Sequence, residues 1–231
     1  PDPIPAGFRS HAIHMIQLNV ALVVHAAAVA LGDPHALELR ARSTALAETI
    51  LATFLRPGGR LVELWPDHPA DHDTVLARHL NPGHALECLW MLLGVAVREG
   101  RADWLGRATE AVLFAFERGW DEEHGGLLHY VDHGGGHPVG RAGDSIYERS
   151  VAGSWSTKLW WVHSEAIYTS LLLYRITGNP DARQWCERVL EYSLRVFPQR
   201  DPAVGEWIQI RDRAGLPLDR VVALPVKDPY H

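Results

Sequence analysis

The sequence repeats one order three times: two segments of helical period, a glycine turn and a short strand-like segment. The helical segments pair at 10–31 with 34–55, at 83–99 with 101–118, and at 158–176 with 180–196. The strand-like segments follow these pairs at 60–65, 127–131 and 207–210. A unit of this kind cannot bury its own apolar face, so such units stack on one another. The repeat predicts an all-α toroid of paired helices, an α/α barrel, with short β-hairpins on one rim over a central cavity where ligands bind.

Three helix pairs make only part of a ring. An open ring leaves apolar helix flanks uncovered at both edges, which soluble proteins avoid. We therefore expect residues 1–231 to form a single, partial α/α-barrel domain, either a fragment of a closed barrel or a unit completed by another chain. The chain begins at Pro1 without an initiator Met and ends at His231 without a closing helix, and both ends are interpreted as cuts.

The composition argues against several functional classes. The net charge is −6 and there is no basic run, which speaks against a nucleic-acid partner. Cys88 and Cys186 are too sparse for a disulfide framework and do not have zinc spacing. We interpret the apolar stretches as too short to cross a membrane, which takes about 18 apolar residues or more. A cytoplasmic protein is therefore expected, with no membrane partner.

Tryptophan and histidine are unusually frequent, with 9 and 14 copies. The face of a Trp ring covers the apolar face of a sugar, so this composition favours a carbohydrate ligand. Trp also packs well in a hydrophobic core, and a purely structural role for these residues has about equal weight.

Residues 81–90, Asn-Pro-Gly-His-Ala-Leu-Glu-Cys-Leu-Trp, are the most informative segment. Pro82 and Gly83 begin a helix, so His84 and Glu87 lie one turn apart on the same face. The positive end of the helix dipole favours the neutral, basic form of an imidazole at His84. Glu87 could orient that imidazole or bind a sugar hydroxyl. The structural alternative is a histidine that only packs near the helix N-terminus against Trp90.

A second segment, residues 158–166, combines an aromatic plane, an acceptor and a cation. Trp161 and Glu165 share a helix face, and we place Lys158 three residues earlier on the same face. This set suits a polyhydroxylated ligand, with Lys158 as a donor to a developing oxyanion. The alternative is an ordinary helix with one exposed ion pair.

Other catalytic classes lack support in the sequence. His68 and His72 have the spacing of a helical metal pair, but Pro69 lies between them in a turn-rich stretch. The sequence contains no HExxH, phosphate-loop or GxSxG motif, so metalloprotease, P-loop and serine-hydrolase chemistry are not indicated. No metal site is predicted.

Five motifs, in order and at similar spacing, resemble those of N-acylglucosamine 2-epimerases. They are Asn81-Pro82-Gly83-His84 with Glu87 and Trp90; Gly119-Trp120-Asp121 with His124-Gly125-Gly126; Lys158-Leu159-Trp160-Trp161 with His163-Ser164-Glu165-Ala166; Gly205-Glu206-Trp207; and Lys227 with Pro229-Tyr230-His231. The resemblance covers essentially the whole chain. It implies an (α/α)6 barrel, in agreement with the repeat.

The resemblance also implies which residues act. The two acid/base histidines of this family correspond to His84 and His231, and residues that line its sugar pocket correspond to Glu87, Trp161 and Glu165. His163 is shared with these enzymes, but it lies on another helix face than Trp161, so it is expected behind the pocket.

One position separates related enzymes. Cellobiose 2-epimerases and aldose–ketose isomerases of the same superfamily carry an additional histidine on the helix that corresponds to 10–31. Asn19 stands there in this sequence, as in the N-acylglucosamine enzymes, and is a candidate substrate-binding residue. His14 is close in sequence but lies on a different helix face.

The implied reaction interconverts N-acyl-D-glucosamine and N-acyl-D-mannosamine by deprotonation and reprotonation at C2. It requires no metal or redox cofactor. The resemblance also implies ATP as an allosteric effector and a homodimer. Three alternatives stay open: an aldose–ketose isomerase or 2-epimerase of unmodified sugars such as mannose and cellobiose; a truncated, non-catalytic sugar-binding module; and a glycosidase with Glu87 and Glu165 as its two carboxylates, which the histidine match disfavours.

Overall fold

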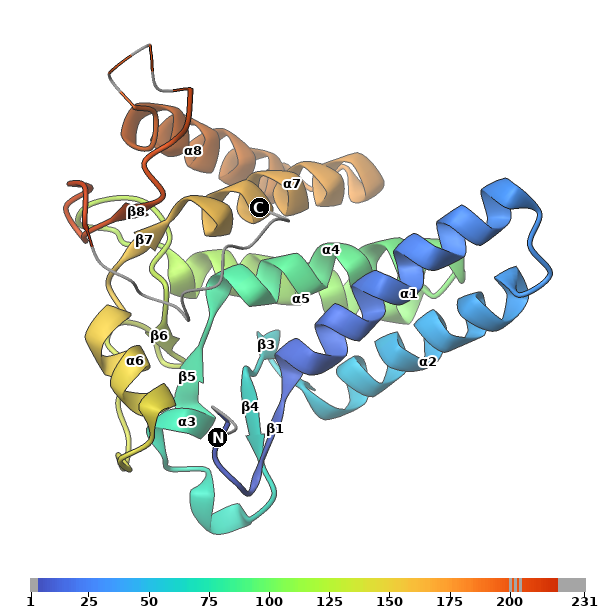
Figure 1. The fold of residues 1–231 in the computed structure, drawn as a ribbon, viewed down its shortest axis with the longest axis horizontal. Coiled ribbons are helices and arrows are strands. Elements are labelled where there is room, and N and C mark those ends of the chain that lie inside the picture. Colours follow the sequence, from blue (N-terminus) through green and yellow to red (C-terminus); the bar gives the residue numbers. More distant parts are fainter. Residues whose placement is uncertain (1–3, 200, 202, 204, 220–231) are drawn as a thin grey trace.

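Six long helices form three antiparallel hairpins in the computed structural model, which describes residues 4–199, 201, 203 and 205–219 (Figure 1). The hairpins are α1 (His11–Leu31) with α2 (Ala36–Thr53), α4 (Pro82–Arg98) with α5 (Ala102–Gly119), and α7 (Trp160–Thr177) with α8 (Pro180–Val196). The predicted helix pairs are confirmed, with bounds that differ by a few residues. α1, α4 and α7 all begin at the end of the molecule where most of the short strands lie (Figure 1).

Local sequence signals account for several of these helix boundaries. Gly32 ends α1 with φ 67° and Gly178 ends α7 with φ 69°, a left-handed conformation that glycine adopts without steric cost. The side chain of Asn81 accepts a hydrogen bond from the backbone N–H of His84 and caps α4. Asn179 caps α8 in the same way, by accepting from Ala182.

The strands of the rim pair differently from the predicted hairpins. Four antiparallel pairs are present in the described residues: β1 (Phe8–Ser10) with β4 (Leu64–Pro66), β2 (Leu55–Arg56) with β3 (Arg60–Leu61), β5 (His79–Leu80) with β6 (Val131–Asp132), and β7 (Lys158–Leu159) with β8 (Ile210–Arg211). The predicted strand at 60–65 is divided between two pairs, and only one residue of 127–131 and one of 207–210 lie in strands. β2 and β3 form a local hairpin, as predicted for the rim, but the other three pairs join distant segments, which alternation within a strand does not reveal.

Three short elements of the rim were not predicted. They are a 3₁₀ turn (Pro69–Asp71), α3 (Val75–Arg78) and α6 (Ile146–Ser154). α6 begins with a capping box, in which the Ser145 hydroxyl accepts from the N–H of Glu148 and the Glu148 carboxylate accepts from the N–H of Ser145. With hindsight, this Ser-x-x-Glu spacing is a signal in the sequence that indicates the helix.

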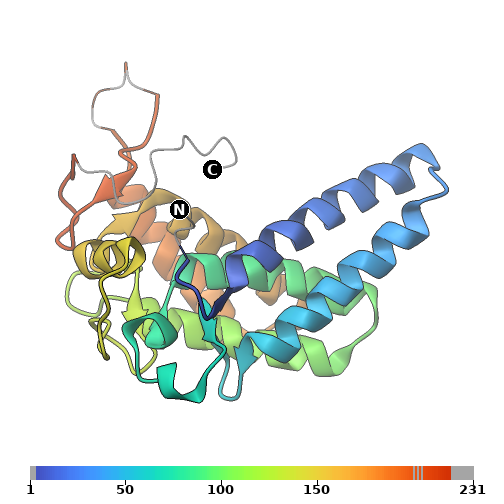
Figure 2. The same cartoon turned by 60° about the horizontal axis from the view of Figure 1, so that its bottom comes forward.

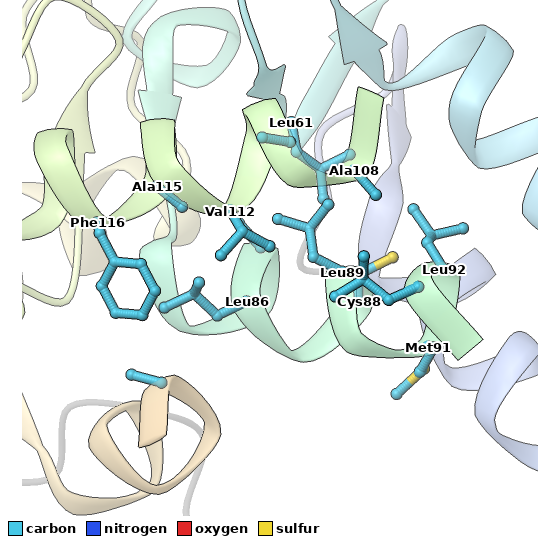
Figure 3. Close-up of a cluster of buried hydrophobic side chains, with 14 of the residues drawn as sticks. Leu61, Leu86, Cys88, Leu89, Met91, Leu92, Ala108, Val112, Ala115 and Phe116 are labelled. Carbon is cyan, nitrogen blue, oxygen red and sulfur yellow. The ribbon is translucent and has the colours of Figure 1, made fainter. Parts of the chain in front are cut away.

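The hydrophobic core lies mainly between α4 and its two neighbours. α4 packs along α5 and along α7. Figure 3 shows Leu86 and Leu89 of α4 close to Val112 of α5, with Phe116 beside them. All four side chains are fully buried. Burying a side chain of this size contributes about 1.5–3 kcal/mol, so this layer holds α4 against α5.

The hairpin of α1 and α2 packs less closely on the rest of the molecule. It diverges from α4 and α5 toward its far end (Figures 1 and 2). Large apolar side chains stay exposed along α1, and others along α7 and α8 at the opposite edge. They are Ile13, Ile16, Val20, Val23, Val24, Val29 and Leu31 on α1, and Tyr168, Leu171, Leu190 and Leu194 on the other edge. Both edges therefore expose apolar flanks, as expected for a partial ring.

The expectation that every apolar stretch is too short to cross a membrane was wrong for α1. This helix has 21 residues and contains no Asp, Glu, Lys or Arg. Its most apolar window has a mean hydropathy of 1.7, and 22% of that window is buried. The only polar side chains in the helix are those of histidines with Gln17 and Asn19, which carry no full charge when the imidazoles are neutral. By length and composition alone, α1 could cross a membrane.

Candidate active site

One face of α4 remains open along the length of the helix. Its members are spaced by three or four residues, so they form a single stripe. They are His84, Glu87, Trp90, Gly94 and Val97, which are half-buried or exposed while most of the other residues of α4 are buried. Trp161, Glu165 and Tyr168 make a similar stripe on α7. The predicted sharing of a face by His84 and Glu87, and by Trp161 and Glu165, is confirmed.

Two contacts join these stripes on α4 and α7. The Nε1–H of Trp90 donates to Oε2 of Glu165 at 2.8 Å. The rings of Trp90 and Tyr168 meet edge to face, with centroids 5.4 Å apart. Trp90 therefore contacts α7, and not His84 as the structural alternative proposed. Together these side chains form a partly polar, aromatic surface between the two helices.

A glycine lets the N-terminal ends of α4 and α7 approach closely. A Cβ atom at Gly83 would lie 2.6 Å from Cγ2 of Val162 and 2.7 Å from the ring of Trp161. Neither contact is tolerated by real side chains. The missing side chain therefore allows the rings of Trp161 and His84 to come within 5.5 Å of each other, with an interplanar angle of 35°.

The partner of His84 is a carboxylate that the sequence analysis missed. Nδ1 of His84 donates to Oε1 of Glu63 at 3.0 Å. The Glu63 side chain is only 4% exposed, whereas that of His84 is 29% exposed. Oε2 of Glu63 lies 3.7 Å from Nδ1 of His11, whose side chain is 1% exposed. Glu63 thus sits between two imidazoles, one of them buried and the other partly open to solvent.

This carboxylate changes the expected charge of His84. Burial disfavours the imidazolium, but the charge of Glu63 and its hydrogen bond, with a contribution from the charge of Glu87, outweigh burial and raise the pKa of His84 to about 9. Burial likewise opposes the ionised form of Glu63, and His84 and His11 overcome it and lower the pKa of Glu63. The prediction of a neutral imidazole was therefore wrong, because a carboxylate at hydrogen-bond distance outweighs a helix dipole.

Further buried aromatic and imidazole side chains lie near this pair. The ring of His79 lies 5.7 Å from that of Tyr130 and 5.4 Å from that of Tyr147, and the ring of His129 stacks on Tyr130 at 3.8 Å. Burial lowers the pKa of His79, and it lowers the pKa of His129 to about 3. The charge of His84 adds to both shifts. These two histidines are therefore neutral at pH 7, and His84 carries the positive charge in this region.

Lys158 does not lie where it was predicted. It belongs to β7, ahead of the helix, and its side chain is fully buried. Its ammonium lies 3.2 Å from Oδ2 of Asp121 and donates to the carbonyl oxygens of Gly125 and Arg213. A Lys ammonium has three N–H donors, and these partners use them all. Lys158 thus holds the rim together, which is a correction to its predicted role as a donor to the substrate.

His163 and Asn19 lie away from His84 for different reasons. His163 is fully buried behind the open face, as its helix position predicts; its Nε2 accepts from the N–H of Leu127 at 2.9 Å. Asn19 is half-buried on α1, eight residues beyond His11, and thus about 12 Å farther along the helix axis. The described contacts join His11, and not Asn19, to Glu63 and His84. The predicted role of Asn19 stays a prediction.

Two further predictions concern His231 and metal binding. His231 and the motif that contains it lie outside the described residues. Within the part of the chain that is described, no group of three or more His, Cys, Asp and Glu side chains is arranged to hold a metal ion. The residues that the structure does bring together are His11, Glu63, His84, Glu87 and Trp161, an arrangement suited to proton transfer beside an aromatic plane.

Comparison with known proteins identifies the family that the chain resembles. The model of the N-acylglucosamine 2-epimerase (GlcNAc 2-epimerase) family matches residues 2–231. The N-acylglucosamine 2-epimerase of Bos taurus is 34% identical over 186 residues, which are 80% of this chain and 41% of the bovine protein. The chain therefore spans less than half the length of that relative.

Solved structures show the same arrangement of helices. A D-mannose isomerase matches with a TM-score of 0.70 and 18% identity, over 94% of this chain and 52% of that one. A cellobiose 2-epimerase from Bacillus thermoamylovorans matches with a TM-score of 0.67 and 17% identity, over 96% of this chain and 50% of that one. With the three helix hairpins, these likenesses confirm the predicted fold class, an α/α barrel or an incomplete part of one.

Proposed function

This chain belongs to the N-acylglucosamine 2-epimerase family, and from that premise we propose that it takes part in the interconversion of N-acyl-D-glucosamine and N-acyl-D-mannosamine. The observation that carries the proposal is the half-exposed imidazole of His84, hydrogen-bonded to the buried carboxylate of Glu63 and next to the ring of Trp161. Inversion at a sugar carbon requires positioned groups that exchange protons, and the aromatic ring beside His84 offers a plane for the apolar face of the sugar.

The open face of α4 and α7 supplies the proposed sugar-binding groups. The ring of Trp161 offers a plane for the apolar face of the sugar. Glu87 and Glu165 are half-buried acceptors for hydroxyl groups, and Trp90 orients Glu165 through its indole N–H. A small number of fixed polar groups beside an aromatic surface is typical of small-molecule sites. The proposed ligand is a neutral, polyhydroxylated molecule.

The proposed chemistry starts from the opened sugar. The aldehyde makes the C2 proton acidic, and one imidazole removes that proton to give an enediolate-like intermediate. A second imidazole then gives a proton to the opposite face of C2, so the configuration inverts and no electron is gained or lost. His84 is protonated at pH 7 and serves first as the acid. His231, which lies outside the described residues, is proposed as the second proton carrier on the strength of the family resemblance, and it acts as the base in the direction in which His84 acts as the acid.

The expectations on partners, cofactors and location are also proposals. The partner is a small sugar, without nucleic acid or membrane. The proton transfers are redox-neutral, so no redox cofactor or metal is proposed. A homodimer and an effect of ATP follow from the family resemblance, and a cytoplasmic location stays a prediction.

The direct test is turnover by the purified chain in deuterated water. N-acetylmannosamine is expected to yield N-acetylglucosamine with deuterium at C2, followed by NMR, and mannose and cellobiose are expected to react more slowly. His84→Gln should lower the rate about 10²–10⁴-fold, the usual contribution of a positioned acid or base. His35→Gln, at an exposed histidine between α1 and α2, is the matched control and should leave the rate unchanged.

Three outcomes would overturn this proposal. Full activity of the His84→Gln variant would exclude His84 as a proton carrier. Conversion of mannose to fructose in preference to reaction of the N-acylated sugar would identify an aldose–ketose isomerase. Binding of N-acetylmannosamine without turnover or deuterium exchange would identify a sugar-binding module.

A further inference from the structure

We propose that Glu63 is a positioning residue for His84: its buried carboxylate binds the Nδ1–H of His84 and leaves Nε2 as the nitrogen that exchanges protons, while His11 holds the second carboxylate oxygen. The three side chains form one unit, named here the His11–Glu63–His84 triad. The role of Nε2 toward a sugar rests on the proposed function. The hydrogen bonding of the triad does not, and it can be tested on the chain without a substrate.

The geometry gives Glu63 two different oxygen environments. Oε1 accepts from Nδ1 of His84 at 3.0 Å, a good charge-assisted hydrogen bond. Oε2 faces Nδ1 of His11 at 3.7 Å, a longer electrostatic contact. Because the Glu63 and His11 side chains are almost fully buried, solvent does not compete for these contacts. The bond to His84 therefore sets the orientation of its ring.

The backbone places Glu63 at this point for a clear reason. β1 pairs with β4 in a register that sets Ser10 opposite Leu64. Glu63 directly precedes β4 and His11 directly follows β1, and the N–H of His11 donates to the carbonyl oxygen of Glu63 at 3.0 Å. The first residues of α1 and α4 meet at the carboxylate, so the positive ends of both helices add to its stabilisation.

The charge balance of the triad places the proton on His84. Nε2 of His11 is buried and has no hydrogen-bond partner in the described part of the chain. A proton on that nitrogen would be a buried donor without an acceptor, which is unfavourable. His84, in contrast, is partly open to solvent and can keep both of its N–H groups satisfied. The exposed edge of His84 therefore makes it the ring of the triad that can exchange protons with solvent.

The other titratable groups near His84 are one carboxylate and two histidines. Glu87, on the same helix, supports the imidazolium, and its charge is the weaker of the two carboxylate effects. His79 and His129 are buried and neutral, so they add no positive charge that would oppose it. Glu63 is therefore the main cause of the protonation of His84, and Glu87 offers a matched comparison, because each substitution to Gln removes one negative charge near the same ring.

The experiment is an NMR titration of the histidine rings of the purified chain between pH 5 and 10. His84 is identified by its loss in His84→Gln. The midpoint of His84 should lie near 9 in the parent chain and fall to 6.5 or below in Glu63→Gln. In Glu87→Gln it should fall by less. Above the midpoint, the nitrogen shifts should report the tautomer with the proton on Nδ1, since Glu63 accepts from that atom.

Each of these readouts can overturn the proposal. A midpoint that Glu87→Gln lowers more than Glu63→Gln would remove Glu63 as the main partner. A proton on Nε2 of neutral His84 in the parent chain would contradict the assigned tautomer, and this measurement needs no variant, so it stands even where Glu63→Gln does not fold. Titration of parent His84 near 6.5, its ordinary value, would also refute the triad.

The titration separates this proposal from the proposed function. Lack of sugar turnover with a high midpoint and an Nδ1 proton would overturn the proposed function and leave the triad intact. Turnover of the sugar together with a His84 midpoint near 6.5 would support the proposed function and overturn the triad. Where the chain is active, the pH profile of kcat/KM should move with the midpoint in Glu63→Gln, a change that loss of stability alone does not produce.

Discussion

His84 and His163 lie in the first turns of two parallel helices, α4 and α7, but their surroundings are opposite. Nδ1 of His84 donates to the buried carboxylate of Glu63, and the pKa of His84 rises to about 9. Nδ1 of His163 donates to the carbonyl oxygen of Leu159, its Nε2 accepts from the N–H of Leu127, and burial lowers the pKa of His163 to about 4. Position on a helix thus has little effect on the charge of these imidazoles. The groups that their ring nitrogens contact, and their burial, have the larger effect.

The two histidines also differ in what they hold in place. The ring of His163 lies 5.2 Å from that of Tyr192 and 4.8 Å from that of Phe197, inside the hydrophobic core. Both of its nitrogens are bonded to backbone groups, so it fixes the turn before Leu127 against α7. His84 has one nitrogen bound and an open edge. We therefore infer a structural role for His163 and a chemical role for His84.

The largest expected effect comes from removing the charge next to His163. Lys158→Met leaves Asp121 buried with one fewer cation and two carbonyl oxygens without their donor. We expect the free energy of unfolding to fall by about 3 kcal/mol, measured by urea denaturation, because breaking a buried ion pair is costly. The hydrogen bond between Glu63 and His84 should remain, as seen in the His84 titration.

Arg183→Ala is the control for that substitution. It breaks an exposed pair with Glu187, at which both side chains are more than 60% exposed. The expected loss is below about 0.5 kcal/mol, because solvent screens exposed pairs. A loss for Lys158→Met no larger than that for the control would contradict the structural role assigned to Lys158.

A smaller effect is expected where α4 and α7 touch. Gly83→Ala would force Trp161 and Val162 to move, since its Cβ lies within 2.7 Å of both. We expect a loss of about 2 kcal/mol in thermal or urea unfolding, typical of overpacking. The ring-current shift of the His84 resonances should also change as Trp161 moves.

Gly94 on the same helix supplies the matched control. Its Cβ would meet nothing within 4 Å, so Gly94→Ala should stabilise the chain by about 0.5–1 kcal/mol through helix propensity. Equal changes in the free energy of unfolding for Gly83→Ala and Gly94→Ala would show that the close approach of α4 and α7 does not require a glycine at position 83.

The smallest expected effect is a difference in the pH dependence of stability. The contribution of His84 is complete below pH 6.5 and is lost as the pH rises toward 9, because the folded state holds the proton more tightly. His163 acts in another pH range. Between pH 6.5 and 4, His163 is protonated in the unfolded chain but stays neutral in the folded chain, so the free energy of unfolding falls as the pH falls.

Urea unfolding at a series of pH values checks both signs. Relative to His84→Gln, the parent should lose stability as the pH rises from 6.5 to 9. Relative to His163→Gln, it should lose stability between pH 6.5 and 4. If the free energy of unfolding of the parent and of a variant changes equally with pH in its range, the pKa shift assigned to that histidine is contradicted.

Much of the fold was predictable because its signals are local. The spacing of apolar residues indicated all six long helices, and glycine and asparagine marked several of their ends. The strand pairs were predicted poorly, since β1 with β4 and β7 with β8 join segments that are far apart along the chain. The statement that every apolar stretch is too short to cross a membrane was wrong for a simpler reason, because residues 11–31 contain no Asp, Glu, Lys or Arg.

Helical periodicity alone places His84 on the first turn of a helix, on the same face as Glu87, and His163 on a different face from Trp161. The binding of His84 by Glu63 and not by Glu87, and the direction of Lys158 into the rim, follow from the packing of distant segments. The physical reason is that charge partners are chosen by distance in space, and the β1–β4 register and the approach of α4 to α7 set those distances.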